Sequence, residues 1–178
     1  MFNFAIDVRH LVSDHPTGKA IYTKRLLDHL LKESKVYAFT TSRDIKIKDK
    51  NLNIKKYSKL LFHIQSAFLI LKNKLTFFAS ESYITPLIIS ILGGKSVVVV
   101  HDLISFKTSS HKFFPTLVER ICLPILARFK SNTFLFSTNS QLEDFKKTFN
   151  PKSKNLHVFF PGSSEFKKRK YKKNHKYI

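Results

Sequence analysis

The run Val97–Val100, followed by His101 and Asp102, constrains the fold of this chain more than any other stretch. Four β-branched residues in a row, preceded by Gly93-Gly94-Lys95, predict a strand that is buried on both faces of a parallel sheet. In open α/β sheets, ligands bind at the carboxyl ends of the strands. His101 and Asp102 are therefore candidate site residues. A turn-capping aspartate and a partly buried histidine at a strand end would explain the same pattern.

Strand-like and helix-like patterns alternate along most of the chain. Short apolar runs predict strands at residues 2–8, 36–40, 53–57, 75–79, 97–100, 133–136 and 156–160. The segments between them predict helices from residue 20 onward and at 58–71, 85–92, 115–130 and 140–149. This alternation predicts one α/β domain over residues 1–162: a Rossmann-like, doubly wound, mostly parallel sheet with helices on both faces.

Apolar spacing predicts which helix faces are buried. The helix that begins at residue 20 has an apolar face made of Tyr22, Leu26, Leu27, Leu30 and Leu31. The helix 115–130 is amphipathic, with these apolar residues at helical spacing: Leu117, Ile121, Ile125 and Phe129.

Polar residues and proline predict the helix boundaries. Ser58 is the predicted N-cap of the second helix, and either Asn139 or Ser140 caps the last one. Pro124 lies inside a helical pattern and predicts a kink or a break near Cys122, because its ring clashes with the preceding turn.

Composition narrows the partners and the compartment. The formal net charge of +20 favours polyanions: nucleic acid, an anionic membrane surface or phosphorylated substrates. Seven basic residues lie between Lys167 and Lys176 without apolar periodicity, so residues 163–178 are predicted to form a basic, disordered tail. The single cysteine excludes a disulfide framework and suits a reducing cytoplasm. The longest apolar stretch, residues 60–71, is too short to span a bilayer, and the histidines show no metal-ligand spacing.

Several segments, taken in order over residues 2 to 162, resemble the amino-terminal domain of family-4 glycosyltransferases, which are retaining enzymes of the GT-B class. The opening of that family reads I-D-x-R and then T-G-I-G-R-Y-T before a leucine-rich helix. The segments that carry the resemblance are Asp7-Val8-Arg9, Thr17–Thr23, Ser80–Leu87, Val97–Leu103, Asn139-Ser140 and His157–Gly162.

The resemblance implies roles for particular residues. Gly18 and Lys19 would lie at the diphosphate of a nucleotide-sugar donor, and His101 would lie near the transferred sugar. Asp102 would orient that histidine or the following loop. Candidate contacts to acceptor or donor are Glu81, Tyr83 and Ser140, for which loop solvation, core packing and a helix N-cap are the respective alternatives. The donor is a co-substrate, so no cofactor and no metal are expected.

The resemblance covers the acceptor-side domain only. In the family, a second domain supplies most of the donor site, and none follows Pro161-Gly162 here. We therefore expect the chain to need a separate carboxyl-terminal domain or subunit and to be inactive alone. Ala20 and Ile21 also replace a glycine and an arginine of the family pattern. Ala20 makes close approach of a diphosphate harder, and Ile21 removes a cation.

Three functions are compatible with these sequence features. The first is transfer of a sugar to a glycan or lipid-linked acceptor, at the cytoplasmic face of a membrane to which the basic surface docks peripherally. The second is a non-catalytic α/β domain that binds nucleic acid or another polyanion, although no recognised nucleic-acid-binding motif is present. The third is a binding module that awaits a separate subunit, which predicts an exposed apolar cleft face.

Overall fold

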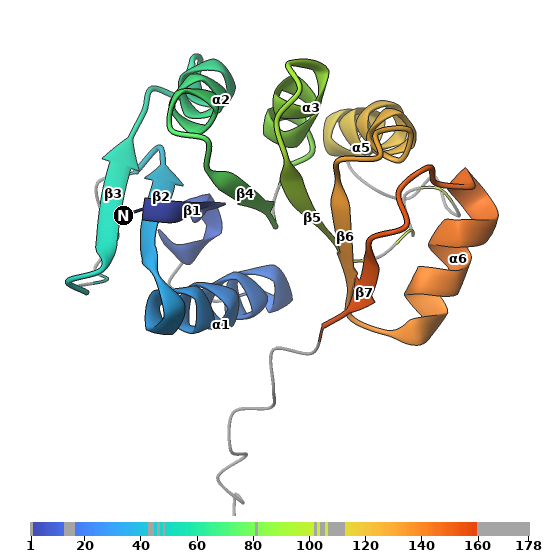
Figure 1. Ribbon diagram of the computed structural model, residues 1–178, viewed down its shortest axis with the longest axis horizontal. Helices are drawn as coiled ribbons and strands as arrows, with labels where there is room; N and C mark the ends of the chain where they lie inside the picture. The colour runs from blue at the N-terminus through green and yellow to red at the C-terminus, as the bar shows by residue number, and fades with distance from the viewer. Residues whose placement is uncertain are drawn as a thin grey trace, which may run out of the picture.

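Seven parallel strands form one sheet in the order β3-β2-β1-β4-β5-β6-β7 (Figure 1). The computed structural model describes residues 2–12, 17–42, 45, 47, 49–80, 82–101, 103, 106 and 113–159. The strands are β1 (Phe2–Asp7), β2 (Lys35–Thr40), β3 (Leu52–Lys56), β4 (Thr76–Ala79), β5 (Ser96–Val100), β6 (Thr133–Phe136) and β7 (Leu156–Val158). The predicted doubly wound α/β fold is confirmed. The predicted tail, residues 163–178, lies outside the described residues.

Helices cover both faces of this sheet. The helical segments are η1 (Arg9–Val12), α1 (Gly18–Glu33), α2 (Phe62–Lys72), α3 (Ile84–Ile91), α5 (Phe113–Leu126) and α6 (Asn139–Phe149). One face packs against α1, whereas α2, α3, α5 and α6 pack on the other (Figure 1). The inner strands are apolar because both of their faces are covered, whereas the edge strand β3 has no buried residue.

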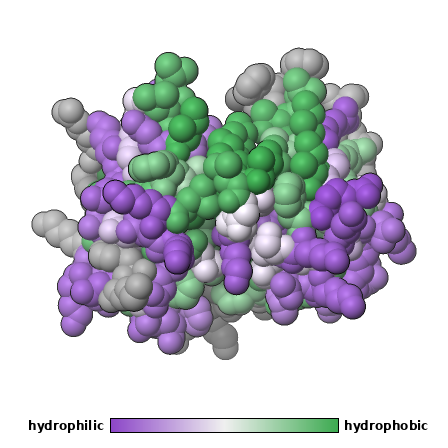
Figure 2. Space-filling view, turned by 45° about the horizontal axis from the view of Figure 1, so that its top comes forward, coloured by the Kyte–Doolittle hydropathy of each residue, from purple (hydrophilic) through white to green (hydrophobic). Residues whose placement is uncertain are grey.

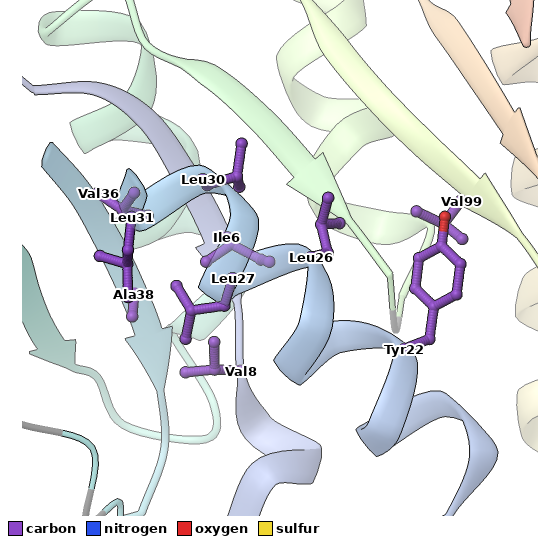
Figure 3. Packing of buried hydrophobic residues seen from close by; sticks show 10 residues of the cluster. All are labelled: Ile6, Val8, Tyr22, Leu26, Leu27, Leu30, Leu31, Val36, Ala38 and Val99. Atoms are coloured by element: carbon purple, nitrogen blue, oxygen red, sulfur yellow. The ribbon is translucent and has the colours of Figure 1, made fainter. Parts of the chain in front are cut away.

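The predicted buried face of α1 is confirmed. All five of its predicted core residues are buried and pack in one cluster with side chains of β1, β2 and β5. Figure 3 shows Tyr22 beside Val99 of β5, on the far side of this cluster from Val36 and Ala38 of β2. The apolar stripe of α1 therefore reaches from the second strand to the fifth.

The predicted inward face of α5 is wrong. Leu117, Ile121 and Ile125 are exposed, and the buried side chains are instead Cys122, Leu123, Leu126 and Ala127. The helix is apolar on two faces, so spacing alone could not tell which one meets the sheet. The helix also continues through Pro124 to Leu126 and is not broken near Cys122.

Two predicted N-caps are also wrong. The second helix begins at Phe62 and not at Ser58, whose Oγ accepts the backbone N–H of Leu61 at 3.3 Å in the preceding turn. The last helix is capped by Thr138, whose Oγ1 accepts the backbone N–H of Gln141 at 3.1 Å. Thr138 can cap because its backbone is extended, as the N-cap position requires. Asn139 is already helical.

The glycine pair after α3 ends that helix as predicted. Gly93 has a φ of +79°, which residues with a side chain rarely adopt. A Cβ on Gly94 would lie 2.5 Å from Ile89 Cγ2 and 2.7 Å from Leu71 Cδ2. The second glycine therefore permits the close packing of α2 against α3, and the chain can enter β5 at the centre of the sheet.

Candidate functional site

The direction in which the strands are added reverses at β1. The chain runs outward through β2 and β3, then crosses back to form β4 on the other side of β1. At such a switch point the connections leave opposite faces of the sheet, and ligands of doubly wound folds bind there, at the carboxyl ends of the strands. Asp7 ends β1, Ser80 follows β4 and His101 follows β5 at this edge.

His101 is held at the switch-point edge by the neighbouring strand. Its Nε2 lies 2.8 Å from the backbone oxygen of Ser80. Because a carbonyl oxygen can only accept, Nε2–H is the donor, and in the neutral ring Nδ1 carries the lone pair. The ring also meets the edge of Tyr22, with 5.2 Å between the ring centroids. The structure thus places an oriented imidazole at the predicted strand end, next to α1.

A hydrogen-bonded network ties His101 to its surroundings. Thr23 of α1 shares a buried hydrogen bond of 2.8 Å with the Ser80 hydroxyl. On the other side, Gln141 of α6 donates from Nε2 to the His101 carbonyl and accepts the Ser137 backbone N–H at 3.0 Å. The network therefore joins the ends of β4, β5 and β6 to the helices α1 and α6.

The sequence pattern did not single out Thr23 or Gln141. Thr23 lies in a helix, and its only signal is a polar residue next to the apolar stripe of α1. Gln141 occupies the third position after the Thr138 cap, where a glutamine usually folds back on the cap itself. Here its side chain binds the backbone of Ser137, just before the cap, and also reaches the end of β5, which no local pattern predicts.

Tyr22 carries the one buried hydroxyl of the site that lacks a hydrogen-bond partner among the described residues. Burial raises the pKa of this phenol to about 12, so it stays protonated at neutral pH. An unpaired buried hydroxyl costs about 1–3 kcal/mol. A ligand that brought an acceptor to this hydroxyl would recover part of that cost.

On the other side of the switch point, Asp7 and Arg9 form an ion pair. The Asp7 carboxylate is buried and accepts Arg9 Nε at 3.0 Å and Nη2 at 2.6 Å, together with the Arg9 backbone N–H at 3.2 Å. The guanidinium carbon of Arg9 lies 4.1 Å from the centre of the Phe62 ring at the start of α2. These contacts hold the turn from β1 into η1 against α2.

Two histidines lie near this ion pair. His63 Nδ1 is 2.8 Å from the Thr85 hydroxyl of α3. Burial lowers the pKa of His63, the Arg9 charge lowers it further, and Asp7 partly opposes both effects. Burial also lowers the pKa of His10, Asp7 raises it, and Lys19 and Arg9 lower it. The charges of Arg9 and Lys19 thus both act on His10, between the end of β1 and the start of α1.

These pKa shifts predict that the protein loses stability in mild acid. Unfolded histidine takes up a proton near pH 6.5, whereas the folded forms of His10 and His63 do so only at lower pH. Acid therefore favours the unfolded chain as the pH falls through 6.5 toward the folded pKa values. We expect the free energy of unfolding, measured with urea between about pH 7 and pH 5, to decrease, and His63→Gln to reduce that slope. The exposed His157→Gln is the control, and equal slopes in both variants would contradict the assignment.

The predicted phosphate-binding turn begins α1. Thr17 is the N-cap, and its hydroxyl oxygen accepts the Ala20 backbone N–H at 3.3 Å. Gly18 has no heavy atom within 4 Å of where a Cβ would lie, and its φ is not in the left-handed range. Neither packing nor backbone conformation requires a glycine there, so the residue leaves room for a ligand. Tyr22, in contact with His101, lies about 6 Å further along the helix axis.

The other candidates are distributed less tightly. Tyr83 is partly buried and packs against the cluster between α5, α6 and the sheet. Ser140 is exposed in the first turn of α6 and is not its N-cap. Glu81 and Asp102 lie outside the described residues. The structure thus brings His101 into the neighbourhood of the turn with Gly18 and Lys19.

The described residues contain no group of three or more His, Cys, Asp or Glu side chains that could hold a metal ion. Within the same residues, each helix is too short or too polar to cross a membrane.

No family model matches the sequence, and a search of curated proteins gives no match. A function for this chain must therefore be inferred from its own residues and geometry and from the resemblance of its motifs.

Proposed function

We propose that this chain is the acceptor-side domain of a retaining, GT-B-type glycosyltransferase that transfers a sugar from a nucleotide-sugar donor to a glycan or lipid-linked acceptor. The observation that carries the proposal is the orientation of His101 at the switch-point edge, next to the first turns of α1. A nucleotide sugar has a diphosphate and a polar ring a few ångströms apart. The open space beside Gly18 suits the diphosphate, and the imidazole suits the sugar ring.

The charges near α1 support the same assignment. In glycosyl transfer the bond between the anomeric carbon and the diphosphate oxygen breaks, and the diphosphate leaves with the electron pair. Lys19 and the backbone N–H groups at the start of α1 would stabilise that negative charge. His101 would hydrogen-bond a hydroxyl of the transferred sugar. The remaining donor contacts would come from a second α/β domain, on another chain or in a longer product.

Binding of the donor tests this proposal without requiring turnover. We expect calorimetric titration with a panel of nucleoside diphosphates and nucleotide sugars to find one nucleotide that binds. His101→Ala should lower the affinity for the nucleotide sugar by about three- to tenfold, because it removes one hydrogen bond. The affinity for the bare nucleoside diphosphate should stay almost unchanged. The matched control is His157→Ala, an exposed histidine on β7.

A second variant addresses the diphosphate. Gly18→Val adds a side chain where the fold leaves open space, so its thermal unfolding should match that of the parent protein. It should lower the affinity for both the nucleoside diphosphate and the nucleotide sugar. If no nucleotide binds, while arbitrary DNA binds with a steep salt dependence, the polyanion-binding alternative replaces this proposal.

A further inference from the structure

Exposed apolar side chains gather on one layer of helices. The helices α2, α3 and α5 lie side by side on one face of the sheet (Figure 1). Eleven large apolar side chains are exposed in the described part of the chain, and nine of them lie on these helices or the adjoining turns. Figure 2 looks onto this layer and shows the apolar residues as a broad patch with hydrophilic residues on its flanks. We call it the α2–α3–α5 layer.

The exposed residues are regularly arranged. Two outward stripes at four-residue spacing run along the outer helices: Leu60, Ile64 and Phe68 on α2 and the turn before it, and Leu117, Ile121 and Ile125 on α5. Between them, Ile91 and Leu92 end α3, and both are more than 60% exposed. Each outer helix also buries a separate face against the sheet. The residues of the outward stripes therefore do not contribute to the hydrophobic core.

The central helix is apolar without a polar side. Residues 84–91 contain no charged residue. A helix of this kind is normally buried in a large protein or placed in lipid, because a surface helix carries charge on its solvent face. On the outer side of α3, Ile84, Leu87 and Ile88 are half-buried and Ile91 is exposed. A contiguous apolar surface of this breadth marks an interaction site.

The charges around the α2–α3–α5 layer indicate what kind of partner covers it. The three helices and their adjoining turns carry seven described basic residues against one acidic residue, Glu119: Lys59, Lys72, Lys74, Lys95, Arg120, Arg128 and Lys130. Most lie at or just beyond the helix ends, which places them around the apolar stripes. A second copy of the chain would set this basic rim against an identical one, which is repulsive. An anionic lipid surface is complementary to both the rim and the apolar centre.

A groove at the margin of the layer has the same character. It lies between the carboxyl-terminal ends of α2 and α3, with a volume of about 430 Å³. Ile70, Leu71 and Leu92 contribute its apolar lining, and Lys74 and Lys95 its cations. An acyl chain with an anionic headgroup combines the two chemistries that this groove offers.

We propose that the α2–α3–α5 layer docks peripherally on anionic lipid membranes. The apolar stripes enter the boundary between headgroups and acyl chains, and the lysines and arginines of the rim contact the headgroups. The proposal is independent of the reaction proposed above, because it rests on a different surface from the switch-point edge.

The absence of tryptophan from the sequence allows a direct test. Phe68→Trp introduces a single tryptophan in the α2 stripe, and Ile21→Trp introduces one on α1, on the opposite face of the sheet. We expect vesicles of phosphatidylglycerol and phosphatidylcholine to shift the emission of the first variant to the blue and to leave the second unchanged. Vesicles of pure phosphatidylcholine should produce a much smaller shift.

A vesicle-binding assay tests whether removal of the exposed apolar side chains weakens membrane binding. Ile64→Gln with Phe68→Gln should lower the partition into anionic vesicles at least about tenfold, because two buried apolar side chains are lost from the interface. Ile21→Gln, which replaces an exposed isoleucine on α1, should leave it unchanged. The altered positions are exposed, so thermal unfolding should confirm an intact fold. The basic segment after residue 166 is the same in every variant and cannot cause a difference between them.

Three results would overturn the proposal. The first is an equal blue shift at positions 68 and 21, which would indicate adsorption without orientation. The second is a shift at position 68 that needs no lipid and follows protein concentration, with dimers in sedimentation, which would make a second copy the occupant. The third is no shift at position 68 with anionic vesicles.

Discussion

Arg9→Ala is expected to lower the free energy of unfolding by about 3–5 kcal/mol, the usual loss when one partner of a buried ion pair is removed. The Asp7 carboxylate is almost inaccessible to solvent and, among the hydrogen bonds between described residues, would keep only the one from the backbone N–H at position 9. The variant also removes the guanidinium from the Phe62 ring, at a further cost of about 0.5–2 kcal/mol. Urea unfolding followed by circular dichroism measures the loss.

The exposed pair Lys146–Glu143 provides the control for this prediction. Its ion pair has a similar length, 2.9 Å, but both side chains are about half exposed. Lys146→Ala should therefore cost no more than about 1 kcal/mol. Replacing both Asp7 and Arg9 with apolar residues of similar volume should recover much of the loss caused by Arg9→Ala. If Arg9→Ala costs no more than Lys146→Ala, the guanidinium does not stabilise the buried carboxylate.

Phe145→Ala is expected to destabilise the protein by about 3–5 kcal/mol, because it leaves a cavity of the size of a phenyl ring. Phe145 is fully buried and anchors α6 to the sheet. Its ring centroid lies 4.8 Å from that of Phe134 and 5.1 Å from that of Phe136, both on β6. The loss should appear in the midpoint of urea unfolding, with a slope close to that of the parent protein.

Phe68→Ala is the matched control for Phe145→Ala. It removes the same side chain from a helix, but at a position that is 68% exposed, so the change should stay within about 0.5 kcal/mol. If both variants lose similar stability, Phe68 contributes to the core, and the α2–α3–α5 layer is not a free surface. The two substitutions thus test the packing of α6 and the basis of the membrane proposal together.

The fold could be predicted because its signals are local. Strands that are covered on both faces must be apolar, so the run Val97–Val100 and the segment Thr133–Phe136 were visible as strands in the sequence. The buried stripe of α1 repeats at the helical period, and it was predicted residue by residue. Helix starts were less predictable. Ser58, Asn139 and Ser140 are all acceptable caps by type, and only the backbone conformation selects the residue that caps.

The candidate site was predictable only in part. Two particular residues, His101 and Gly18, were visible because one follows an apolar strand and the other lies at the start of a helix. Their neighbourhood was not visible, because Thr23, Ser80 and Gln141 meet through contacts between residues far apart in the chain. Such contacts depend on the order of the strands in the sheet, which hydrophobic periodicity does not encode.

The amino-acid sequence by itself determined the class of fold, the order of its elements and the strand end that carries His101, because burial and helical period act over a few neighbouring residues. Only the tertiary structure decided which apolar face of α5 meets the sheet and which remains outside. A helix with two apolar faces gains similar free energy from burying either one. The choice is made by the side chains of β5, β6 and α6 that pack against it.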